Sequence, residues 1–368
     1  MRILYDHHLS SRQYAGGATR YFYELMRYLS GIPEVEVEFL MGSSATVCPF
    51  RDLSSANTRV RAFNGPPLPG VWRYAANEAF GECIAPFLGR MDVYHPTLYS
   101  CMPMVRTRRV VATHHDCTPE RFPQEFRHTD RVIRAKRGLY ERADALICVS
   151  ESCRRDLLEF YEVDPAKTRI IYHGVSKLPR CPEAGNLIRQ KTRREFLLYV
   201  GSRTCYKNFT GLLQAFCETG LHESLDLLVL GGGPLTAEER ALMADLKLSD
   251  CVVSIEEVSD TLLGEAYAGA KLFVYPSLWE GFGFPPLEAM AAGCPVLASN
   301  TSSIPEVCLD APFYFDPQDQ ASFNRALLCA INDEEARRQA IEKGNKVAAR
   351  YSWSKCGEQT LALYHGCQ

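Results

Sequence analysis

The chain has 368 residues, of which 46% are hydrophobic and 23% are charged. This length exceeds what a single compact core usually holds and suits two domains. Lysine and arginine total 41 against 44 aspartate and glutamate residues, a formal net charge of −3. The sequence therefore lacks the basic excess that is typical of nucleic-acid-binding domains, and we expect no nucleic-acid partner.

The apolar stretches are too short to span a bilayer, and the N-terminus lacks the apolar core of a signal peptide. Cysteine is abundant at 15 residues, an odd number at irregular spacings and often beside apolar residues. That pattern favours reduced, buried thiols over a disulfide framework. We expect a cytoplasmic location.

Strand and helix patterns alternate from the first residues onward. Residues 3–5 predict a short buried strand, a loop ending in Gly16 and Gly17 follows, and residues 21–29 carry apolar side chains at helical spacing. Residues 35–39 then alternate like a strand. This strand–loop–helix–strand unit is typical of a parallel α/β sheet. Later segments continue the series, with strands near 92–95, 110–113 and 145–149 and helices at 129–143 and 151–161.

A proline-containing, partly basic stretch divides the chain, and a second α/β series begins with the strand 196–200. We predict a first domain over 1–176, a linker over 177–194, a second domain over 195–350, and a final segment, 351–368, that contains a helix. In such sheets ligands bind at the carboxyl ends of the strands, where the strand order reverses. Residues that do chemistry should therefore lie in the strand-to-helix loops.

The richest of these loops is residues 276–293, which follow a buried strand. Glu280 lies in the loop and Glu288 near the start of a short helix, whose first turn contains Pro285. Gly283 lets the backbone approach a ligand, and amide groups at a helix start favour an anion such as phosphate. A carboxylate there accepts hydrogen bonds from sugar or ribose hydroxyls. The alternative is that Glu288 only stabilises the helix start.

A second loop, residues 200–208, leaves a buried strand and contains Arg203 and Lys207. Two cations can neutralise a diphosphate leaving group without a metal ion. The alternative is a pair of solvated surface cations.

A third loop contains His114, His115 and Asp116 at the end of a strand. Adjacent ligands make poor metal geometry, so we favour a polar contact of His115 with substrate over a metal site. The paired glycines Gly16 and Gly17 are a weak signal by themselves, since glycines in such loops are often only turn residues.

Together these motifs resemble glycosyltransferase family 4, over nearly the whole chain. The most specific match is the spacing of Glu280 and Glu288 within Glu-Gly-Phe-Gly-Phe-Pro-Pro-Leu-Glu-Ala-Met-Ala-Ala-Gly. The opening Ile-Leu-Tyr-Asp-His and the Tyr-Lys-Asn after Cys205 resemble bacterial polysaccharide mannosyl- and rhamnosyltransferases. The resemblance implies the GT-B fold, in which two Rossmann-like domains face each other across a donor-binding cleft and the last helix crosses back to the N-terminal domain.

The resemblance also implies roles. Arg203 and Lys207 bind the diphosphate of the sugar donor, Glu288 holds the ribose, and Glu280 contacts the transferred sugar. It further implies that the amides of Gly283 and Phe284 help to hold the sugar and the phosphates, and that His115 lies near the anomeric carbon. Gly16 and Gly17 would approach the diphosphate or the acceptor, and Val258 would lie near the base. His173 stands where many relatives carry Asn, a departure outside the donor motif.

We therefore expect retaining transfer of a hexose or deoxyhexose, with GDP-mannose the favoured donor, to a saccharide or lipid-linked saccharide acceptor. No metal cofactor is required. Two alternatives remain: an acceptor-independent nucleotide-sugar epimerase or hydrolase, and a non-catalytic sugar-nucleotide-binding scaffold. A dinucleotide oxidoreductase would need a Gly-x-Gly-x-x-Gly fingerprint that the sequence lacks.

The predicted helix at 129–143 carries Arg131, Arg134, Lys136 and Arg137. Such a cluster either contacts anionic lipid at the cytoplasmic face of a membrane or is an ordinary solvated helix face.

Overall fold

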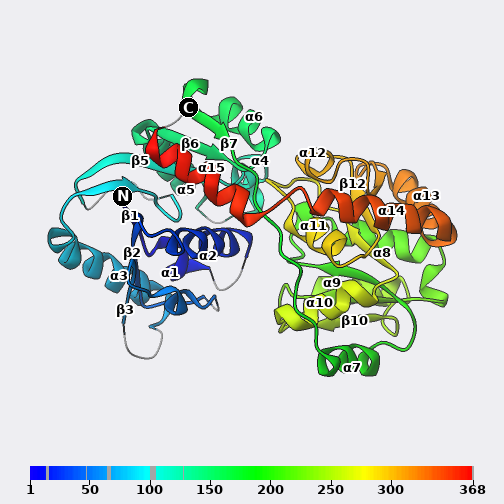
Figure 1. The fold of residues 1–368 in the computed structure, drawn as a ribbon. Helices are drawn as coiled ribbons and strands as arrows, with labels where there is room; N and C mark the ends of the chain where they lie inside the picture. Colours follow the sequence, from blue (N-terminus) through cyan, green and yellow to red (C-terminus); the bar gives the residue numbers. More distant parts are fainter. Residues whose placement is uncertain (14–15, 47, 64–67, 100–104, 127, 367–368) are drawn as a thin grey trace. The chain divides into compact units, whose positions relative to one another are not determined.

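The computed structural model describes the whole chain except residues 14–15, 47, 64–67, 100–104, 127 and 367–368. The chain forms two compact units (Figure 1). The first unit comprises Met1–Gly174 together with Ser352–Gln368, and the second comprises Val175–Tyr351.

The described residues of the first unit contain a seven-stranded parallel sheet in the order β3-β2-β1-β4-β5-β6-β7. Because β1 pairs with both β2 and β4, the strand order reverses between β1 and β4. The strands are β1 (Arg2–Tyr5), β2 (Glu36–Gly42), β3 (Thr58–Ala62), β4 (Met91–Tyr94), β5 (Thr107–His114), β6 (Ala145–Cys148) and β7 (Thr168–Ile170). The helices are α1 (His8–Arg12), α2 (Gly17–Ser30), α3 (Gly70–Ile84), α4 (Thr118–Arg121), α5 (Thr129–Arg142), α6 (Glu151–Phe160) and α15 (Trp353–His365), with short 3-10 turns η1 (Phe50–Leu53) and η2 (Ala85–Phe87).

The second unit contains a six-stranded parallel sheet in the order β10-β9-β8-β11-β12-β13. Here the order reverses between β8 and β11. The strands are β8 (Phe196–Val200), β9 (Asp226–Leu230), β10 (Val252–Ile255), β11 (Leu272–Tyr275), β12 (Val296–Ser299) and β13 (Phe313–Phe315). The helices are α7 (Pro182–Lys191), α8 (Phe209–Glu218), α9 (Ala237–Asp245), α10 (Asp260–Gly269), α11 (Phe284–Ala291), α12 (Ile304–Cys308), α13 (Gln320–Asn332) and α14 (Glu334–Ala348), with the 3-10 turn η5 (Cys205–Lys207).

Central strands of the second sheet are apolar on both faces, since every residue from Leu227 to Leu230 is fully buried. Continuous apolar strands of this kind belong to parallel sheets that helices cover on both sides. The predicted α/β architecture is thus confirmed, with two sheets of the Rossmann type whose strand order reverses once in each.

The last helix packs within the first unit, against α2. A Cβ on Gly357 would lie 2.2 Å from the Tyr28 ring, so only glycine permits this close approach. At the end of α15 the Tyr364 hydroxyl hydrogen-bonds the Tyr5 hydroxyl at 2.9 Å and Nδ1 of His95 at 2.5 Å, both in the sheet core.

Residues 177–194, predicted as a linker, lie in the second unit and contain the helix α7. Pro182 occupies the first helical position, where its missing amide hydrogen costs nothing, and Ile188 is buried. The helix lies against α10, and a Cβ on Gly264 of α10 would lie 2.3 Å from the carbonyl oxygen of Pro179. Pro182 thus begins a helix and the chain at Pro179 packs closely against α10, so this stretch is a folded part of the second unit and not a linker.

The cysteines of the described ranges are all free thiols, and Cys148, Cys153 and Cys308 are among the buried ones. Within the same ranges, the structure contains no helix with the length and apolar character needed to cross a bilayer.

Candidate functional site

Loops at the carboxyl ends of adjacent strands bring most of the predicted residues of the second unit to one edge of its sheet. Arg203 and Lys207 follow β8, Glu280 and Gly283 follow β11, and Val258 follows the edge strand β10. The reversal of strand order between β8 and β11 is the point at which such sheets bind ligands.

Lys207 and Glu280 meet across this reversal point. The Lys207 ammonium donates to Oε1 of Glu280 at 2.6 Å, and both side chains are largely buried. The ammonium also lies 5.8 Å from the ring centre of Tyr275, whose pKa is raised first by burial and then by the charge of Glu280. A cation and a carboxylate therefore share a partly desolvated position, where charge interactions are stronger than in water.

Two serines at the end of β12 fix the Glu280 loop. The Ser302 hydroxyl accepts the Glu280 amide hydrogen at 3.0 Å, and the Ser303 hydroxyl donates to the carbonyl oxygens of Glu280 and Phe282 at 3.0 and 3.1 Å. These residues were not predicted as part of the site. They preorganise the loop, so the Glu280 backbone is held before any ligand arrives.

Arg203 follows β8 as predicted, but its guanidinium is directed at the chain's own groups. It donates to Glu239 at 2.8 Å and to the carbonyl oxygens of Gly231, Gly233 and Pro234 at 2.8, 3.0 and 2.8 Å. At least four of its five N–H groups are thus engaged, and the side chain is 3% exposed.

The loop that Arg203 holds runs from Gly231 to Pro234, after β9. Its three glycines have φ angles of 79°, 78° and 77°, a left-handed conformation that other residues seldom adopt. A Cβ on Gly232 would lie 2.6 Å from the carbonyl oxygen of Gly201, so the loops after β8 and β9 are in close contact. Arg203 and Glu239, which also forms the capping box of α9 with Thr236, tie them together.

The helix α11 begins where the sequence predicted. Gly283 precedes it with φ 95°, and Phe284 is its first residue. Because Pro285 and Pro286 lack amide hydrogens, the backbone donors at this helix start are those of Gly283 and Phe284. An anion at this position would meet these two amides.

Glu288 is the fifth residue of α11 and therefore lies beyond the first turn. The Tyr267 hydroxyl of α10 donates to its Oε2 at 3.4 Å, and the pKa of that buried tyrosine is raised by burial and by the Glu288 charge. Helix-dipole stabilisation falls off within the first turn, which disfavours the alternative of a purely helix-stabilising role. Val258 lies half-buried in the loop between β10 and α10.

In the first unit, His115 follows β5 and contacts aromatic rings. Its ring centre lies 5.6 Å from that of Tyr21 and 6.1 Å from that of His173. Its Nε2 is buried and has no hydrogen-bond partner among the residues that the structure describes. Burial lowers the pKa of His115 to about 4 against the raising effect of Asp116, so the imidazole is neutral near pH 7. A neutral ring can donate to or accept from a sugar hydroxyl.

The residues beside His115 make hydrogen bonds within the first unit. His114 Nδ1 bonds the Tyr140 hydroxyl at 2.6 Å and its Nε2 lies 3.4 Å from Cys117 Sγ, while Asp116 accepts the Thr118 amide hydrogen at 2.8 Å. Each of these groups is thus engaged in a contact within the first unit.

Gly16 caps the start of α2 and Gly17 is its first residue; both are exposed. A residue we did not single out, Asp6, anchors the reversal point of the first sheet. Its carboxylate accepts from the Tyr94 hydroxyl at 2.6 Å and from the Thr97 hydroxyl and amide at 2.7 and 3.0 Å. Its position directly after β1 was the only sequence signal.

Beside Asp6, one ligand atom each of His7, His8 and Glu78 lies within 4.8 Å of the others. The two imidazoles are stacked, with ring centres 4.5 Å apart and 26° between their planes. Lone pairs of stacked rings run side by side instead of converging on one ion, so we do not propose a metal there.

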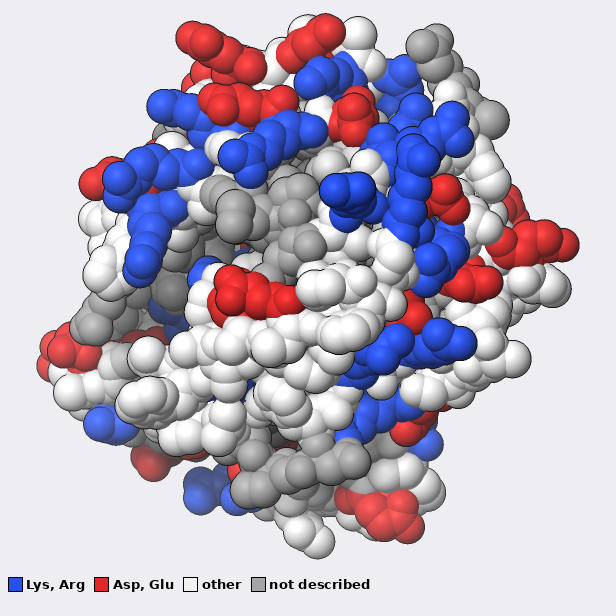
Figure 2. Space-filling model, turned by 90° about the vertical axis from the view of Figure 1, so that its left-hand side faces the viewer, with Lys and Arg blue, Asp and Glu red and all other residues white. Residues whose placement is uncertain are grey.

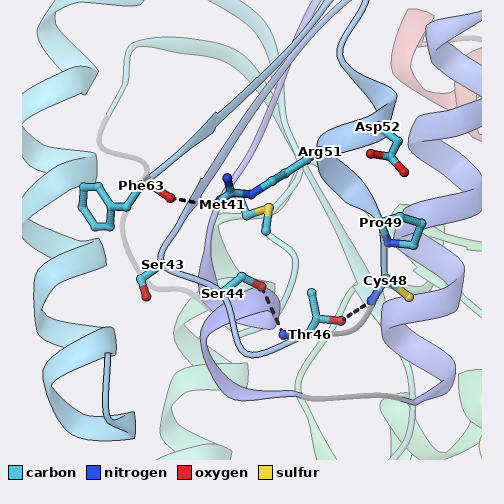
Figure 3. Close-up of a pocket in the computed structure, with 9 residues that line it drawn as sticks. All are labelled: Met41, Ser43, Ser44, Thr46, Cys48, Pro49, Arg51, Asp52 and Phe63. Carbon is cyan, nitrogen blue, oxygen red and sulfur yellow. Dashed lines mark hydrogen bonds between the residues drawn. The ribbon is translucent and has the colours of Figure 1, made fainter. Parts of the chain in front are cut away.

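A hollow of about 310 Å³ lies where β2 and β3 end, in the first unit (Figure 3). Ser43, Ser44 and Thr46 line it, together with Arg51 and Asp52. Such a volume is at the small end of ligand sites, and the polar lining suits hydroxylated ligands.

The predicted basic cluster on α5 needs one correction. Arg131, Arg134 and Arg137 are exposed, but Lys136 is fully buried and donates to Glu120 at 2.8 Å and to the Asp116 carbonyl oxygen at 2.8 Å. Lys136 therefore belongs to the core beneath α5 and cannot contact a membrane. Its position on α5 places the Lys136 side chain on the buried face of the helix.

Acid should destabilise the first unit selectively. Burial lowers the pKa of His7 and His115 to about 4 and that of His95 to about 3, from an unfolded value of 6.5. Since the unfolded chain binds these protons and the folded chain does not, stability is lost as the pH falls below 6.5. Each histidine should contribute about 1.4 kcal/mol of loss between pH 7.5 and 5.5. Hydrogen exchange, corrected for its intrinsic pH dependence, should show β1 and β4 losing protection before β8 and β9. Equal loss in both units would contradict this expectation.

Two family models match the chain. One, described as Glycosyltransferase Family 4, matches residues 15–177, and the other, Glycosyl transferases group 1, matches residues 186–347. A similar protein, O-antigen chain mannosyltransferase B of Escherichia coli, is 31% identical over 284 residues, which cover 74% of this chain and 74% of that protein.

Solved structures share the fold. Sucrose-phosphate synthase from Thermosynechococcus elongatus has a TM-score of 0.78 at 21% identity over 99% of this chain and 98% of its own. Anabaena HepE in complex with UDP-glucose has a TM-score of 0.75 at 16% identity over the full length of both. These likenesses support the GT-B fold that the sequence resemblance implied. Together with the identity and coverage of the O-antigen relative, the two family models show that this chain belongs to glycosyltransferase family 4.

Proposed function

We propose that this chain transfers a hexose or deoxyhexose, with mannose favoured, from a nucleoside diphosphate sugar to a saccharide or lipid-linked saccharide acceptor, with retention of anomeric configuration. The O-antigen relative is a mannosyltransferase by name, which supports mannose and bacterial surface polysaccharide synthesis. The single observation that carries the proposal is the Lys207–Glu280 pair at the reversal point of the second sheet.

In this proposal Lys207 is the principal cation for the diphosphate. Departure of the nucleoside diphosphate builds negative charge on its phosphate oxygens, and a largely buried ammonium beside them stabilises that charge most effectively. The amides of Gly283 and Phe284 add donors at the start of α11. The proposal needs no metal ion, because these groups supply the positive charge.

For Arg203 we propose a positioning role in place of the direct phosphate contact that the resemblance implies. Its guanidinium already holds Gly231, Gly233, Pro234 and Glu239, so it shapes the glycine loop that lies against the diphosphate loop. A phosphate contact would require it to give up these bonds.

Glu280 would then accept hydrogen bonds from the transferred sugar once the diphosphate competes for Lys207. For His115, Gly16, Gly17 and Val258 we retain the contacts that the resemblance implies. The leaving phosphate itself would assist the incoming acceptor hydroxyl, so no protein nucleophile is needed. The hollow lined by Ser43, Ser44 and Thr46 is our candidate for acceptor-side hydroxyl binding.

Glu288→Ala should weaken donor binding by roughly 10–150-fold, because a hydrogen bond to a charged group contributes about 1.5–3 kcal/mol. Titration calorimetry with the preferred nucleotide sugar measures the loss. Tyr267→Phe is the matched control: it removes the 3.4 Å hydrogen bond to Glu288 but keeps the carboxylate, so affinity should change little. A lower melting temperature with unchanged donor affinity in Glu288→Ala would reduce Glu288 to a structural residue.

A thermal-shift screen against GDP-, UDP- and dTDP-sugars would identify the donor, since a bound ligand raises apparent stability by mass action. We expect GDP-mannose to give the largest shift, and Lys207→Ala to abolish it. If no nucleotide sugar stabilises the wild-type protein, the donor assignment fails.

A further inference from the structure

Exposed apolar side chains gather on one short stretch of the first unit. Six large hydrophobic residues of the described chain are exposed, and four of them lie between residues 68 and 87. Val71 and Trp72, at the start of α3, are 85% and 72% exposed, and Phe87, in η2, is 86% exposed. Grouped exposure of this kind marks an interaction surface, whereas single exposed residues do not.

The outer face of α3 is apolar except at Glu82. Its inner face is fixed, because fully buried Asn77 bonds the amide and carbonyl groups of Ser43 at 2.7 Å each. The opposite face carries the stripe of exposed residues that we call the α3 stripe: Val71, Trp72, Ala75, Ala79, Cys83 and Phe87. Glu82 is the one charged residue on that face. The other two charged residues nearby face elsewhere: Arg73 donates to the carbonyl oxygens of Leu68 and Ser11, whereas Glu78 lies against His7 and His8.

Unpaired arginines lie next to the Phe87 end of the stripe. Arg90 lies between η2 and the start of β4. The Met91 amide of β4 donates to the Arg106 carbonyl oxygen at 3.1 Å, and β4 pairs with β5, so Arg106 and Arg108 lie beside Arg90 at the amino-terminal ends of these strands. All three side chains are exposed, and among the described residues none has a carboxylate partner. Figure 2 views the molecule from the side on which α3 lies; a largely white area has Lys and Arg groups above it, with Asp and Glu groups among them and an acidic group at its upper border.

We propose that the α3 stripe docks the first unit on an anionic phospholipid surface, with Trp72 and Phe87 entering the interfacial region and Arg90, Arg106 and Arg108 facing the headgroups. The stripe has an aromatic side chain near each end, Trp72 at the start of α3 and Phe87 in η2, and arginines lie beside Phe87. Aromatic and basic side chains together suit a membrane interface, where rings enter the headgroup region and cations meet anionic lipid. Trp72 and Phe87 are 15 positions apart along α3 and η2, a distance on the order of 22 Å at the helical rise of about 1.5 Å per residue. The inference rests on the proposed function, because a lipid-linked acceptor would give this surface its purpose.

The test is co-sedimentation of the full chain with vesicles of phosphatidylglycerol and phosphatidylethanolamine, and with phosphatidylcholine vesicles, at low and high salt. The wild-type protein should bind the anionic vesicles at low salt and dissociate from them at high salt. Trp72→Ser combined with Phe87→Ser should lower the bound fraction at least about tenfold, and Arg90→Gln with Arg106→Gln and Arg108→Gln should remove the preference for anionic lipid. These side chains are exposed, so the variants should melt like the wild type.

Leu328→Ser is the matched control, because Leu328 is an exposed apolar residue of the second unit; its vesicle binding should be unchanged. Lys207→Ala should also bind vesicles normally, which separates failure of this inference from failure of the proposed function. Wild-type protein that stays in solution, or a Trp72→Ser/Phe87→Ser variant that still sediments, would overturn the proposal. If the wild-type protein does not bind vesicles but elutes as a dimer from a sizing column, and the same double variant elutes as a monomer, the stripe contacts a second copy of the chain instead.

Discussion

Lys207→Ala should lower the rate of sugar transfer by about 10²–10³-fold at saturating donor, with the acceptor's KM little changed. That is the usual consequence of removing one preorganised group that stabilises charge in the transition state. The effect should be large here because the Lys207 ammonium is held 2.6 Å from Glu280 in a partly desolvated site, where water would substitute poorly for it. Steady-state rates with the donor identified by thermal shift provide the measurement.

Lys346→Ala is the control for Lys207→Ala, since Lys346 is an exposed lysine on α14 of the same unit with no role in the site. Its rate should match the wild type. Lys207→Arg keeps the charge but changes its shape and should recover part of the activity. Near-normal transfer by Lys207→Ala would remove the central residue of the proposed mechanism.

Lys136→Met should lower the free energy of unfolding of the first unit by about 3–5 kcal/mol, the usual cost of leaving one member of a buried ion pair alone. The Lys136 side chain is fully buried and that of Glu120 is 2% exposed, and their charged atoms lie 2.8 Å apart. The Tyr161 hydroxyl also donates to Glu120, so the carboxylate would keep one neutral partner and lose the Lys136 ammonium, its ion-pair partner among the described residues. Urea titration followed by circular dichroism measures the change.

Two further variants decide whether the pair itself is responsible. Lys136→Met with Glu120→Gln removes both charges and should recover much of the lost stability, because no unpaired charge remains. Arg134→Met, an exposed position on the same helix, should change stability by no more than about 0.5 kcal/mol. Equal destabilisation by Arg134→Met and Lys136→Met would show that the helix surface, and not the buried pair, is being measured.

The start of α11 could be predicted because its signals are local. Pro285 and Pro286 suit the first turn, Gly283 supplies the left-handed residue before it, and Gly293 follows the helix end with φ 77°. These features fix where Glu280 and Glu288 lie along the chain, and the structure places both residues accordingly. The short apolar runs at residues 196–200 and 272–275 likewise predicted the buried strands that lead into the loops of the site.

The orientation of Arg203 could not be predicted, because its partners come from elsewhere in the chain. Glu239 is on α9 and the accepting carbonyl groups follow β9, and only the folded sheet brings β9 beside β8. Thr236 and Glu239 form the capping box of α9, a local pattern that says nothing of the second contact of Glu239 with Arg203.

Lys136 and Trp72 show that the burial of a side chain could not be predicted from the sequence either. Helical spacing places basic residues on α5 without telling which one turns toward Glu120, a residue 16 positions earlier. The apolar composition of α3 would ordinarily indicate core, yet only Asn77 and Gly81 of that helix are buried. Burial depends on what packs against a helix, and that is decided by distant parts of the sequence.

The most direct test of the central claim is product analysis after incubation with GDP-mannose, or the donor that thermal shift identifies, with and without a saccharide acceptor. We expect a new glycosidic bond only when the acceptor is present, with the anomeric configuration of the donor retained in the product as read by NMR, and no such product from Lys207→Ala. Free sugar or an epimerised nucleotide sugar formed equally well without acceptor would contradict the account.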